Sequence, residues 1–446
     1  MITGKENKAN IISAIPGKNA KKIVARDNKV LATTTKLAPV TVKNAKGAVF
    51  EDVDGNVFLD FTSGVGVVNT GHCHPLVVKA VQKQAAEVMH FAGTDFYYDV
   101  QVSLAEKIND IIPINDKVKI YFGNSGTEAV EAAIKLVRWS TKRKLFLSFM
   151  GAFHGRTMGS LSLTASKSLH QKNYFPSMPG VFHVPYPNPY RNPFGIDGYE
   201  DPQALTNATL DFMEYMFEKY VPPEEVGAIF FESVQGEGGY IVPPKDFAQK
   251  LKKMTEEHGI LLVDDEIQAG FGRTGKMFAI QHWNTEPDIV TIAKGMGSGM
   301  PIGACVFRAK YDFDTDGAHS TTFGGNLVAC AASLATINVI EKEHLLDNAV
   351  KMGSHLGKRL GEFKETYQQI GDARGVGLMQ ATEFVYGGKK PAKDLRDKII
   401  KNAYRKGLLI LPCGISAIRY IPPLIINREQ LDHGLDILEG AIRESL

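Results

Sequence analysis

The chain has 446 residues, of which 44% are hydrophobic and 22% are charged, and its formal net charge is +2. This length predicts two or three domains, and the composition is typical of a soluble globular protein. The small net charge excludes strong electrostatic attraction to nucleic acid or to an acidic membrane surface, and no apolar run is long enough for a transmembrane helix.

The N-terminal segment and the cysteines indicate the compartment. Residues 1–8 are polar and lack the apolar core of a secretion signal. The four cysteines lie far apart and form no Cys-x-x-Cys pair. This spacing argues against a disulfide framework and against a zinc site, and it fits a reducing compartment. We therefore expect a cytoplasmic protein with no metal.

The first elements predicted along the chain are a helix and a hairpin. Residues 1 to about 45 form a peripheral arm, helical near residues 20–30. Hydrophobic residues alternate over residues 49–61, and the Asp54-Gly55 dipeptide in their middle favours a tight turn between two strands.

Residues 123–129, Gly-Asn-Ser-Gly-Thr-Glu-Ala, predict the start of a helix. Ser125 and Glu128 fit a capping box, and the apolar residues that follow recur at helical spacing. The free N–H groups and the positive dipole end of such a start suit a phosphate, and the hydroxyls of Ser125 and Thr127 add donors. An ordinary capped helix explains the same residues.

A glycine-flanked aromatic comes next, in the run Gly-Ala-Phe-His-Gly-Arg-Thr at residues 151–157. Phe153 could stack on a planar cofactor, and Arg156 could hold a substrate carboxylate with two hydrogen bonds. The alternatives are a core aromatic residue and a surface arginine. Residues 186–202 are rich in Pro, Tyr, Asn and Gly and predict a long ordered loop.

The middle of the chain predicts a parallel sheet. Residues 228–232 and 260–265 read as strands, and residues 245–258 between them read as an amphipathic helix. Repeated strand–helix–strand units place helices over a mostly parallel sheet, which is an α/β fold.

Two charged residues follow predicted strands. Asp265 ends the strand at 260–265, at the sheet edge where ligands bind in open α/β sheets, and a carboxylate there can keep a ring nitrogen protonated. An aspartate that caps the next turn is the alternative. Lys294 lies between an apolar run and the glycine-rich residues 295–303, which suits a lysine that forms a Schiff base and then moves. Most lysines are, however, solvated surface groups.

The last motifs lie toward the C-terminus. Residues 320–326, Ser-Thr-Thr-Phe-Gly-Gly-Asn, could bind phosphate or could be a simple loop before the helical stretch that starts near Leu327. Arg419 lies in a mostly apolar run, where a charge usually needs a partner, and Glu237 lies in a glycine-rich segment. The sequence alone does not place these two together, and a surface arginine on an edge strand is the alternative.

Taken in order, these motifs resemble those of the class III, ω-type pyridoxal-phosphate aminotransferases of fold type I, and most of all the 4-aminobutyrate aminotransferase group. The resemblance runs from about residue 40 to residue 425. It implies a large domain with a mostly parallel central sheet covered by helices, plus a smaller α+β domain formed by the N- and C-terminal parts. We expect residues 1–70 to form the arm and hairpin of the small domain, residues 71–330 the large cofactor-binding domain, and residues 331–446 the C-terminal small domain.

The resemblance also implies pyridoxal 5'-phosphate as the cofactor and a role for each matching residue. Lys294 would hold the cofactor and carry a proton, and Asp265 would pair with the pyridine nitrogen. The phosphate would be bound by Ser125, Gly126 and Thr127, and by Thr322 contributed to the neighbouring subunit. Further cofactor contacts would come from Phe153, His154, Ile267 and Gln268.

Substrate contacts implied by the resemblance are Arg156, Glu232, Glu237 and Arg419. Arg419 would bind the α-carboxylate of glutamate, and Glu237 would cover it while an ω-amine occupies the site, so that one pocket accepts two substrates. The shared phosphate site implies a homodimer, with a dimer of dimers left open. Ser233, Leu327 and Cys73 depart from the residues that are common in the family.

Two functions fit this pattern. The first is transfer of the amino group of a 4-aminobutyrate- or ornithine-like ω-amino acid to 2-oxoglutarate, which gives a semialdehyde and glutamate. The second is racemisation or epimerisation of an amino acid, which needs a second acid/base that the sequence does not single out. Intact Lys294 and Asp265 disfavour a catalytically silent binding protein, and the chain lacks the glycine fingerprint of a dinucleotide site.

Overall fold

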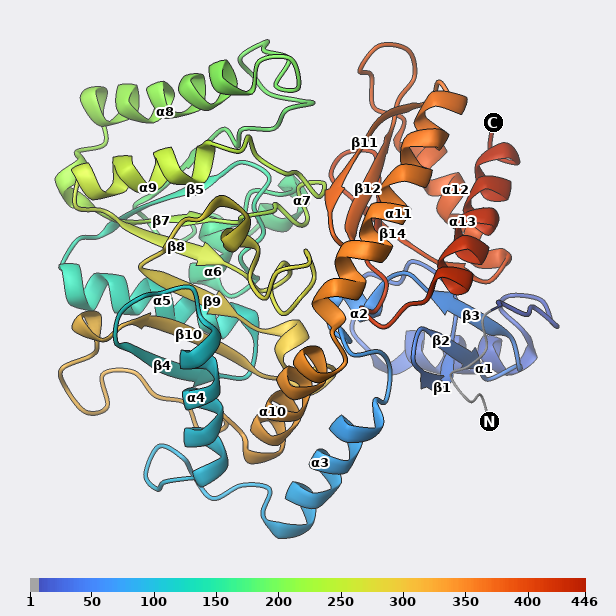
Figure 1. Cartoon of the computed structure of the whole chain (residues 1–446), viewed down its shortest axis with the longest axis horizontal. Coiled ribbons are helices and arrows are strands. Elements are labelled where there is room, and N and C mark those ends of the chain that lie inside the picture. Colours follow the sequence, from blue (N-terminus) through green and yellow to red (C-terminus); the bar gives the residue numbers. More distant parts are fainter. Residues whose placement is uncertain (1–7) are drawn as a thin grey trace. The chain divides into compact units, whose positions relative to one another are not determined.

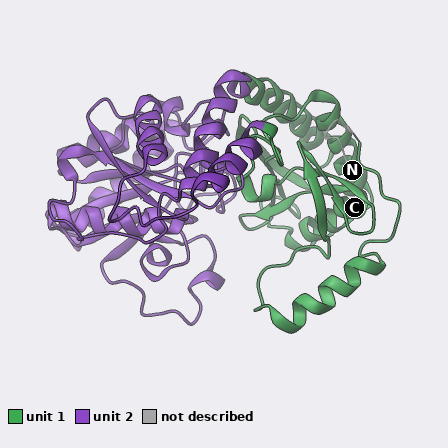
Figure 2. Ribbon diagram, turned by 90° about the horizontal axis from the view of Figure 1, so that it is seen from below, with its two compact units in different colours: residues 1–75, 347–446 green, residues 76–346 purple. Residues whose placement is uncertain are grey.

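The computed structural model describes residues 8–446, and its internal contacts divide the chain into two compact units (Figure 2). Unit 1 combines the N-terminal part up to Pro75 with Asp347–Leu446, and unit 2 is Leu76–Leu346. The sequence placed these divisions after residues 70 and 330. The second division lies after Leu346 and not after residue 330, because helix α10 (Leu327–Lys342) packs against α4 (Asp99–Ile111) of unit 2. Of the polar N-terminal segment, residues 1–7 lie outside the described residues.

Unit 2 is built on one seven-stranded sheet (Figure 1). Its strands follow the order β4 (Val118–Gly123), β10 (Gly303–Arg308), β9 (Ile289–Ile292), β8 (Leu261–Asp265), β7 (Val226–Phe231), β5 (Leu145–Phe149) and β6 (Val181–Val184). The pairs β9–β8, β8–β7, β7–β5 and β5–β6 are parallel, and only β10 runs antiparallel to its neighbours. The predicted mostly parallel α/β sheet is therefore confirmed.

Helices surround this sheet. Besides α4 and α10 they are α3 (Pro75–Glu87), α5 (Gly126–Thr141), α6 (Met158–Leu163), α7 (Ser168–Gln171), α8 (Pro202–Lys219) and α9 (Phe247–Glu257). Short 3-10 turns occur at η1 (Pro223–Glu225), η2 (Ala279–Trp283), η3 (Lys294–Met296) and η4 (Ala309–Tyr311). The predicted strand–helix–strand unit corresponds to β7, α9 and β8, and residues 186–201 form a loop without helix or strand, as expected.

The contacts of helix α5 show which strand residues point to its side of the sheet. Its apolar face, which includes Ala133, Leu136 and Val137, packs in one buried cluster with alternate strand residues such as Phe230 and Val263. Because successive side chains of a strand point to opposite faces, the residues between them face away from α5. Burial of this helix face is the main reason why α5 is held firmly at the end of β4.

Unit 1 contains two four-stranded sheets. One has the order β1 (Val42–Lys46), β2 (Val49–Asp52), β3 (Val57–Asp60) and β13 (Leu408–Leu409), and the other has the order β11 (Ile370–Val376), β12 (Met379–Phe384), β15 (Ala417–Tyr420) and β14 (Leu411–Cys413). The helices are α1 (Lys18–Val30), α2 (Ser63–Gly66), α11 (Leu345–Thr366, which starts in unit 2), α12 (Lys393–Arg405) and α13 (Arg428–Arg443).

The predicted hairpin and the predicted N-terminal helix are both present, and they are linked. Strands β2 and β3 pair antiparallel around Asp54 and Gly55. The Asp54 carboxylate accepts hydrogen bonds at 2.8 Å from the backbone N–H groups of Asn19 and Ala20, in the first turn of α1. Asp54 thus lies in the turn of the hairpin and also caps the N-terminus of α1, whose own N-cap residue makes no side-chain hydrogen bond.

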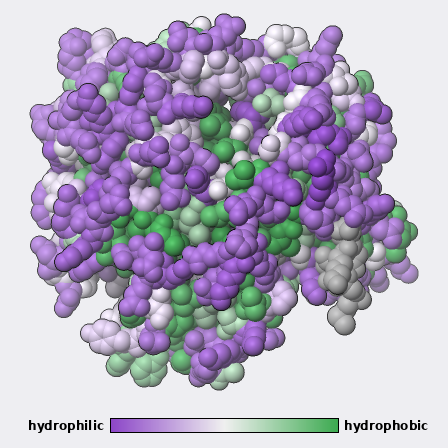
Figure 3. Space-filling model, in the orientation of Figure 1, coloured by the Kyte–Doolittle hydropathy of each residue, from purple (hydrophilic) through white to green (hydrophobic). Residues whose placement is uncertain are grey.

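One segment of unit 2 exposes an unusual number of hydrophobic side chains. The segment between α3 and α4, at the lower end of the view in Figure 3, exposes Val88, Met89, Phe91, Phe96 and Tyr97. Phe323 is also exposed, and its ring lies 4.9 Å from that of His90. None of the described helices is long and apolar enough to cross a membrane. This patch has the character of an interface with another protein surface.

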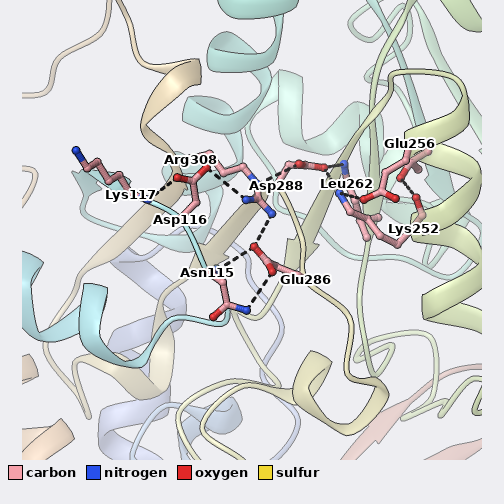
Figure 4. Close-up of polar contacts among 10 residues, drawn as sticks. Asn115, Asp116, Lys117, Lys252, Glu256, Leu262, Glu286, Asp288 and Arg308 are labelled. Atoms are coloured by element: carbon pink, nitrogen blue, oxygen red, sulfur yellow. Dashed lines mark hydrogen bonds and ion pairs between the residues drawn. The ribbon is translucent and has the colours of Figure 1, made fainter.

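An ionic network ties together the end of the sheet where β8 and β9 begin (Figure 4). Arg308, the last residue of β10, contacts Glu286 at 2.6 Å, Asp288 at 3.4 Å and Asp116 at 3.5 Å. Asp288 also accepts hydrogen bonds from Lys252 at 2.8 Å and from the backbone N–H of Leu262 at 3.0 Å. Arg308 therefore joins three chain segments at the edge opposite to Asp265.

Replacement of Arg308 by methionine is expected to lower the free energy of unfolding by about 1.5–3 kcal/mol, the usual contribution of hydrogen bonds to charged groups. Denaturant unfolding measures the change. Lys358→Met is the control, since Lys358 and Glu362 form an exposed pair at 3.9 Å that should contribute nothing measurable. Equal stabilities of the two variants would show that the Arg308 network does not hold the sheet.

Candidate active site

The carboxyl ends of three adjacent strands bring the main candidate residues together in unit 2. Glu232 follows β7, Asp265 ends β8, and Lys294 follows β9 after one intervening residue. Strand register aligns Phe231 with Asp264, and Asp265 with Thr291. Glu232 and Asp265 are thus neighbours across the sheet, at the edge where parallel α/β sheets bind ligands.

Asp265 is held by two hydrogen bonds. Its Oδ2 accepts from His154 Nδ1 at 2.6 Å, and its Oδ1 accepts from the backbone N–H of Ile267 at 3.0 Å. Burial lowers the pKa of His154, but the hydrogen bond and charge of Asp265, together with the charge of Glu232, outweigh it and raise that pKa overall. The pairing therefore favours an imidazolium that fixes the carboxylate in place.

The N-terminus of α5 has the predicted cap with one difference. The Ser125 hydroxyl accepts from the backbone N–H of Glu128. The Glu128 carboxylate accepts from Ser125 Oγ at 2.9 Å and from the backbone N–H of Asn124 at 2.8 Å, one residue before the position expected for a capping box. A side chain at Gly126 would meet Ile267 at 2.9 Å, so Ile267 packs directly on the start of the helix.

Thr127 belongs to a cluster of hydroxyl groups that the sequence did not reveal. Its Oγ1 lies 2.8 Å from Thr157 Oγ1 and 2.6 Å from Ser160 Oγ, and Thr157 donates to Glu131. Gly155 has φ +139°, and a side chain there would meet Thr127 Oγ1 at 2.3 Å. The cluster therefore requires glycine at position 155. In the sequence, the hydroxyl residues Thr157 and Ser160, shortly after Gly155, are the only feature that could have indicated the cluster.

Phe153 and Arg156 lie together. The Phe153 ring is partly buried and packs edge-on against His170 at 5.6 Å. The guanidinium carbon of the exposed Arg156 lies 5.7 Å from the centre of the same ring. The Arg156 guanidinium is thus accessible to anions in solution, and its contact with the Phe153 ring limits its orientations.

Glu232 is a buried carboxyl group close to Asp265. Burial raises its pKa to about 7, although His154 and hydrogen bonds from the backbone N–H groups of Gly236 and Phe153 lower it. The N–O distances of those bonds are 3.1 Å and 3.2 Å. Glu232 therefore changes its charge near neutral pH.

Replacement of Glu232 by glutamine is expected to remove an ionisation near pH 7 from the pH profile of kcat/KM. Because the native pKa is raised from 4.5 to about 7, the native state binds an extra proton in that interval, so stability falls as pH rises from about 4.5 to 7 and is constant above. The variant should lose this slope as well. A profile that keeps the same ionisation would assign it to another group.

The remaining residues are placed as follows. Lys294 begins the turn η3 with φ +42°. Thr322 is exposed in the loop before α10. Glu237 contacts Lys167 at 3.4 Å, a neighbour that the sequence did not indicate. Arg419 is buried in β15 of unit 1, between β12 and β14. The pairing of Arg419 with Glu237 stays a prediction.

The residues around this sheet edge fit pyridoxal phosphate. The start of α5 offers backbone N–H groups and two hydroxyls for a phosphate. Asp265 offers a fixed negative charge for a pyridine nitrogen, and Ile267 lies between the two. Among the described residues, Gln268 Oε1 is buried without a hydrogen-bond donor, which a ligand group could supply.

Comparison with known proteins decides the family. The sequence profile of class III aminotransferases matches residues 30–442. The chain belongs to this family. It is accordingly a pyridoxal-phosphate enzyme, as the resemblance of its motifs predicted. A solved amine transaminase from an uncultivated Pseudomonas species, in its pyridoxal-phosphate-bound form, is similar with a TM-score of 0.86 and 30% identity, over 94% of this chain and 98% of that one.

Its relatives differ in what they do. An alanine/serine racemase of Pyrococcus horikoshii is 42% identical over 98% of this chain and 93% of its own length. A leucine/methionine racemase of Thermococcus litoralis is 39% identical over 95% of both chains. A probable 4-aminobutyrate aminotransferase of Bacillus subtilis is 38% identical over 89% of this chain and 92% of its own.

Proposed function

We propose that this class III enzyme is an amino-acid racemase or epimerase, the second of the two functions considered from the sequence. The supporting observation is the 42% identity to an alanine/serine racemase, which extends over 98% of the chain. A second racemase is also more similar, over more of the chain, than the probable 4-aminobutyrate aminotransferase. The substrate class is then a neutral α-amino acid.

The residues of the chain have the following parts in this reaction. Bound pyridoxal phosphate supplies an electron-withdrawing ring that makes the Cα–H of an attached amino acid acidic. Ser125, Gly126 and Thr127 would hold its phosphate, and Asp265 would favour the protonated form of its ring nitrogen. Lys294 Nζ takes the proton from Cα. Inversion further requires a second acid, on the opposite face of the same carbon, that returns a proton there while Lys294 Nζ keeps the one that it took.

The experiment is a reaction of the purified holoenzyme with L-alanine, L-serine or L-leucine, each without any keto acid. Chiral chromatography should show the D-enantiomer accumulating over many turnovers, while the absorption of the lysine-bound cofactor persists. Lasting loss of that absorption after one equivalent of amine, with no D-enantiomer, would instead show an aminotransferase.

Transfer of an ω-amine to 2-oxoglutarate is the second candidate, since Glu237 and Arg419 are both retained and the probable 4-aminobutyrate aminotransferase matches over 89% of the chain. In that case Arg419→Ala is expected to raise KM for 2-oxoglutarate by about 10–100-fold, because a charge-assisted contact with a carboxylate is lost. Initial rates with 4-aminobutyrate as donor measure this. An unchanged KM would exclude Arg419 as the carboxylate site.

We also propose that the enzyme is a homodimer with shared active sites. The exposed hydrophobic segment between α3 and α4 lies beside the loop that carries Thr322, because the Asn326 side chain donates to the backbone carbonyl of Met89 at 3.0 Å. An interface at this patch would bring Thr322 close to the second subunit. Loss of the dimer in Phe91→Asp, measured by light scattering, would support this arrangement.

A cytoplasmic location is proposed on the chemistry of the cysteines. None of the four forms a disulfide, and Cys305, Cys330 and Cys413 are buried. Cysteines without disulfides are usual where thiols are kept reduced.

A further inference from the structure

Two carboxyl groups lie beside Asp265 and take no part in the reaction described above. Asp264 and Glu266 are its neighbours in the chain, and both are fully buried. Alternation along β8 places Leu261 and Val263 on the face that packs against α5, so Asp264 points to the opposite face. The Asp264 carboxyl group therefore lies on the face of the sheet opposite to Asp265 and does not face the cofactor site.

Each of the two carboxyl groups uses one oxygen in an ordinary hydrogen bond. Ser233 Oγ donates to Asp264 Oδ1 at 2.8 Å, and the backbone N–H of Ile280 donates to Glu266 Oε1 at 2.8 Å. Asp264 Oδ2 and Glu266 Oε2 are buried and have no donor among the described residues. Residues i and i+2 of an extended chain lie on one face, which brings these two oxygens toward each other, and each carboxyl group acts on the pKa of the other. Two carboxylates only accept hydrogen bonds, so this contact requires a proton.

We propose that Asp264 is protonated in the folded enzyme and donates its proton to Glu266, and that this pair positions Asp265 and the segment after it. Glu266 is well placed for this. Its backbone N–H donates to Thr291 of β9 at 2.9 Å, and its carbonyl accepts from Gly270 at 2.9 Å. Fixing its side chain therefore fixes the turn that carries Ile267 and Gln268.

The electrostatics agree with this assignment of the proton. Burial, together with the charge of Glu266, raises the pKa of Asp264 well above its ordinary value, against the opposing hydrogen bond from Ser233. Burial raises the pKa of Glu266 to about 7, while backbone N–H groups and the bond with Asp264 lower it. The charge of Asp265 also raises the pKa of both Asp264 and Glu266. Tyr186 is a further titratable group near Asp264. Asp264 is thus the group that keeps its proton.

Ser233 supports the same conclusion. Its hydroxyl group is the donor to Asp264 Oδ1 at 2.8 Å. Ser233 and Asp264 are both fully buried. The serine hydroxyl occupies the second oxygen of the Asp264 carboxyl group, which leaves the protonated oxygen to face Glu266.

The direct test is infrared spectroscopy of the holoenzyme at pH 8, where Glu232 is mostly ionised. Wild type should show the carbonyl band of a protonated carboxylic acid, and Asp264→Asn should lose it. Asp316→Asn, at an exposed position, is the control and should keep the band. Absence of the band from wild type, or its persistence in Asp264→Asn, would overturn the proposal.

A second readout is the pH dependence of stability. Native Asp264 keeps a proton that the unfolded chain releases near pH 3.8, so wild-type stability falls as pH rises from there toward the raised native pKa. Asp264→Asn lacks this loss, because its amide donates to Glu266 at every pH. Its folding equilibrium constant relative to wild type should grow about tenfold per pH unit in that window.

Urea unfolding at pH 5.5, 6.5 and 7.5 measures this ratio, with Asp264→Ala as the variant that offers Glu266 no donor. Asp264→Ala should be less stable than Asp264→Asn and should bind the cofactor more weakly. A constant ratio of Asp264→Asn to wild type across pH, or equal damage from both variants, would contradict a shared proton. None of these readouts depends on whether the enzyme racemises or transfers amines.

Discussion

Replacement of Lys294 by alanine is expected to abolish the absorption of the lysine-bound cofactor and to reduce turnover by at least about 10³-fold. Lys294 begins a turn one intervening residue after the end of β9, beside the strand that ends at Asp265. The mechanism proposed above gives it two tasks, covalent attachment of the cofactor and transfer of the Cα proton. Loss of general acid–base catalysis alone typically lowers a rate by about 10²–10⁴-fold.

The experiment compares absorption spectra and single-turnover rates of wild type, Lys294→Ala and the control Lys253→Ala. Lys253 is exposed on α9, where it pairs only loosely with Glu257 at 3.7 Å, so its replacement should leave both readouts unchanged. Added methylamine should restore part of the rate in Lys294→Ala, because a free amine can replace the missing base. A fully active Lys294→Ala would refute the assigned mechanism.

The local structure at the candidate site could be predicted from the sequence because its signals are local. A strand end marks Asp265, a strand followed by glycines marks Lys294, and a serine three residues before a glutamate marks the start of α5. Each of these features depends on a few consecutive residues, which a single sequence displays directly.

The contacts between distant segments could not be predicted in this way. His154 reaches Asp265 across 111 residues. Thr127 meets Thr157, which precedes α6, and Ser160 in α6, about 30 residues away. Such pairs depend on strand order and on which face each residue occupies, neither of which a local pattern contains. The motif that contains His154 was recognised, but its partner was not.

The reversed strand β10 is a different case, since its cause is visible in the sequence. Only residues 293–302 separate β9 from β10. A parallel connection needs a crossover of a dozen or more residues, so a strand that follows so closely has to run antiparallel. The glycine-rich connection was interpreted only as flexible backbone around Lys294, although its length also sets the direction of the next strand.

Replacement of Asp265 by asparagine is expected to preserve the fold and to reduce turnover by about 10²–10³-fold, the range for removal of one preorganised electrostatic contact. Asparagine has nearly the same shape but no charge to stabilise a protonated ring nitrogen. The pKa of His154 should fall as well, since burial then acts without the opposing charge and hydrogen bond of Asp265. The rate loss in Asp265→Asn is therefore expected to come from altered electrostatics and not from altered packing.

The pH dependence of unfolding separates these two explanations. In wild type the native pKa of His154 is raised above 6.5, so its contribution to stability is complete below pH 6.5 and is lost as pH rises through the native value. Asp265→Asn should therefore be least stable, relative to wild type, at acidic pH, and the difference should shrink as pH rises. Asp265→Glu restores the charge and should recover part of this pattern. A rate loss in Asp265→Asn with a stability difference that is constant with pH would mean that the ring nitrogen, and not the imidazolium, is the principal partner of this carboxylate.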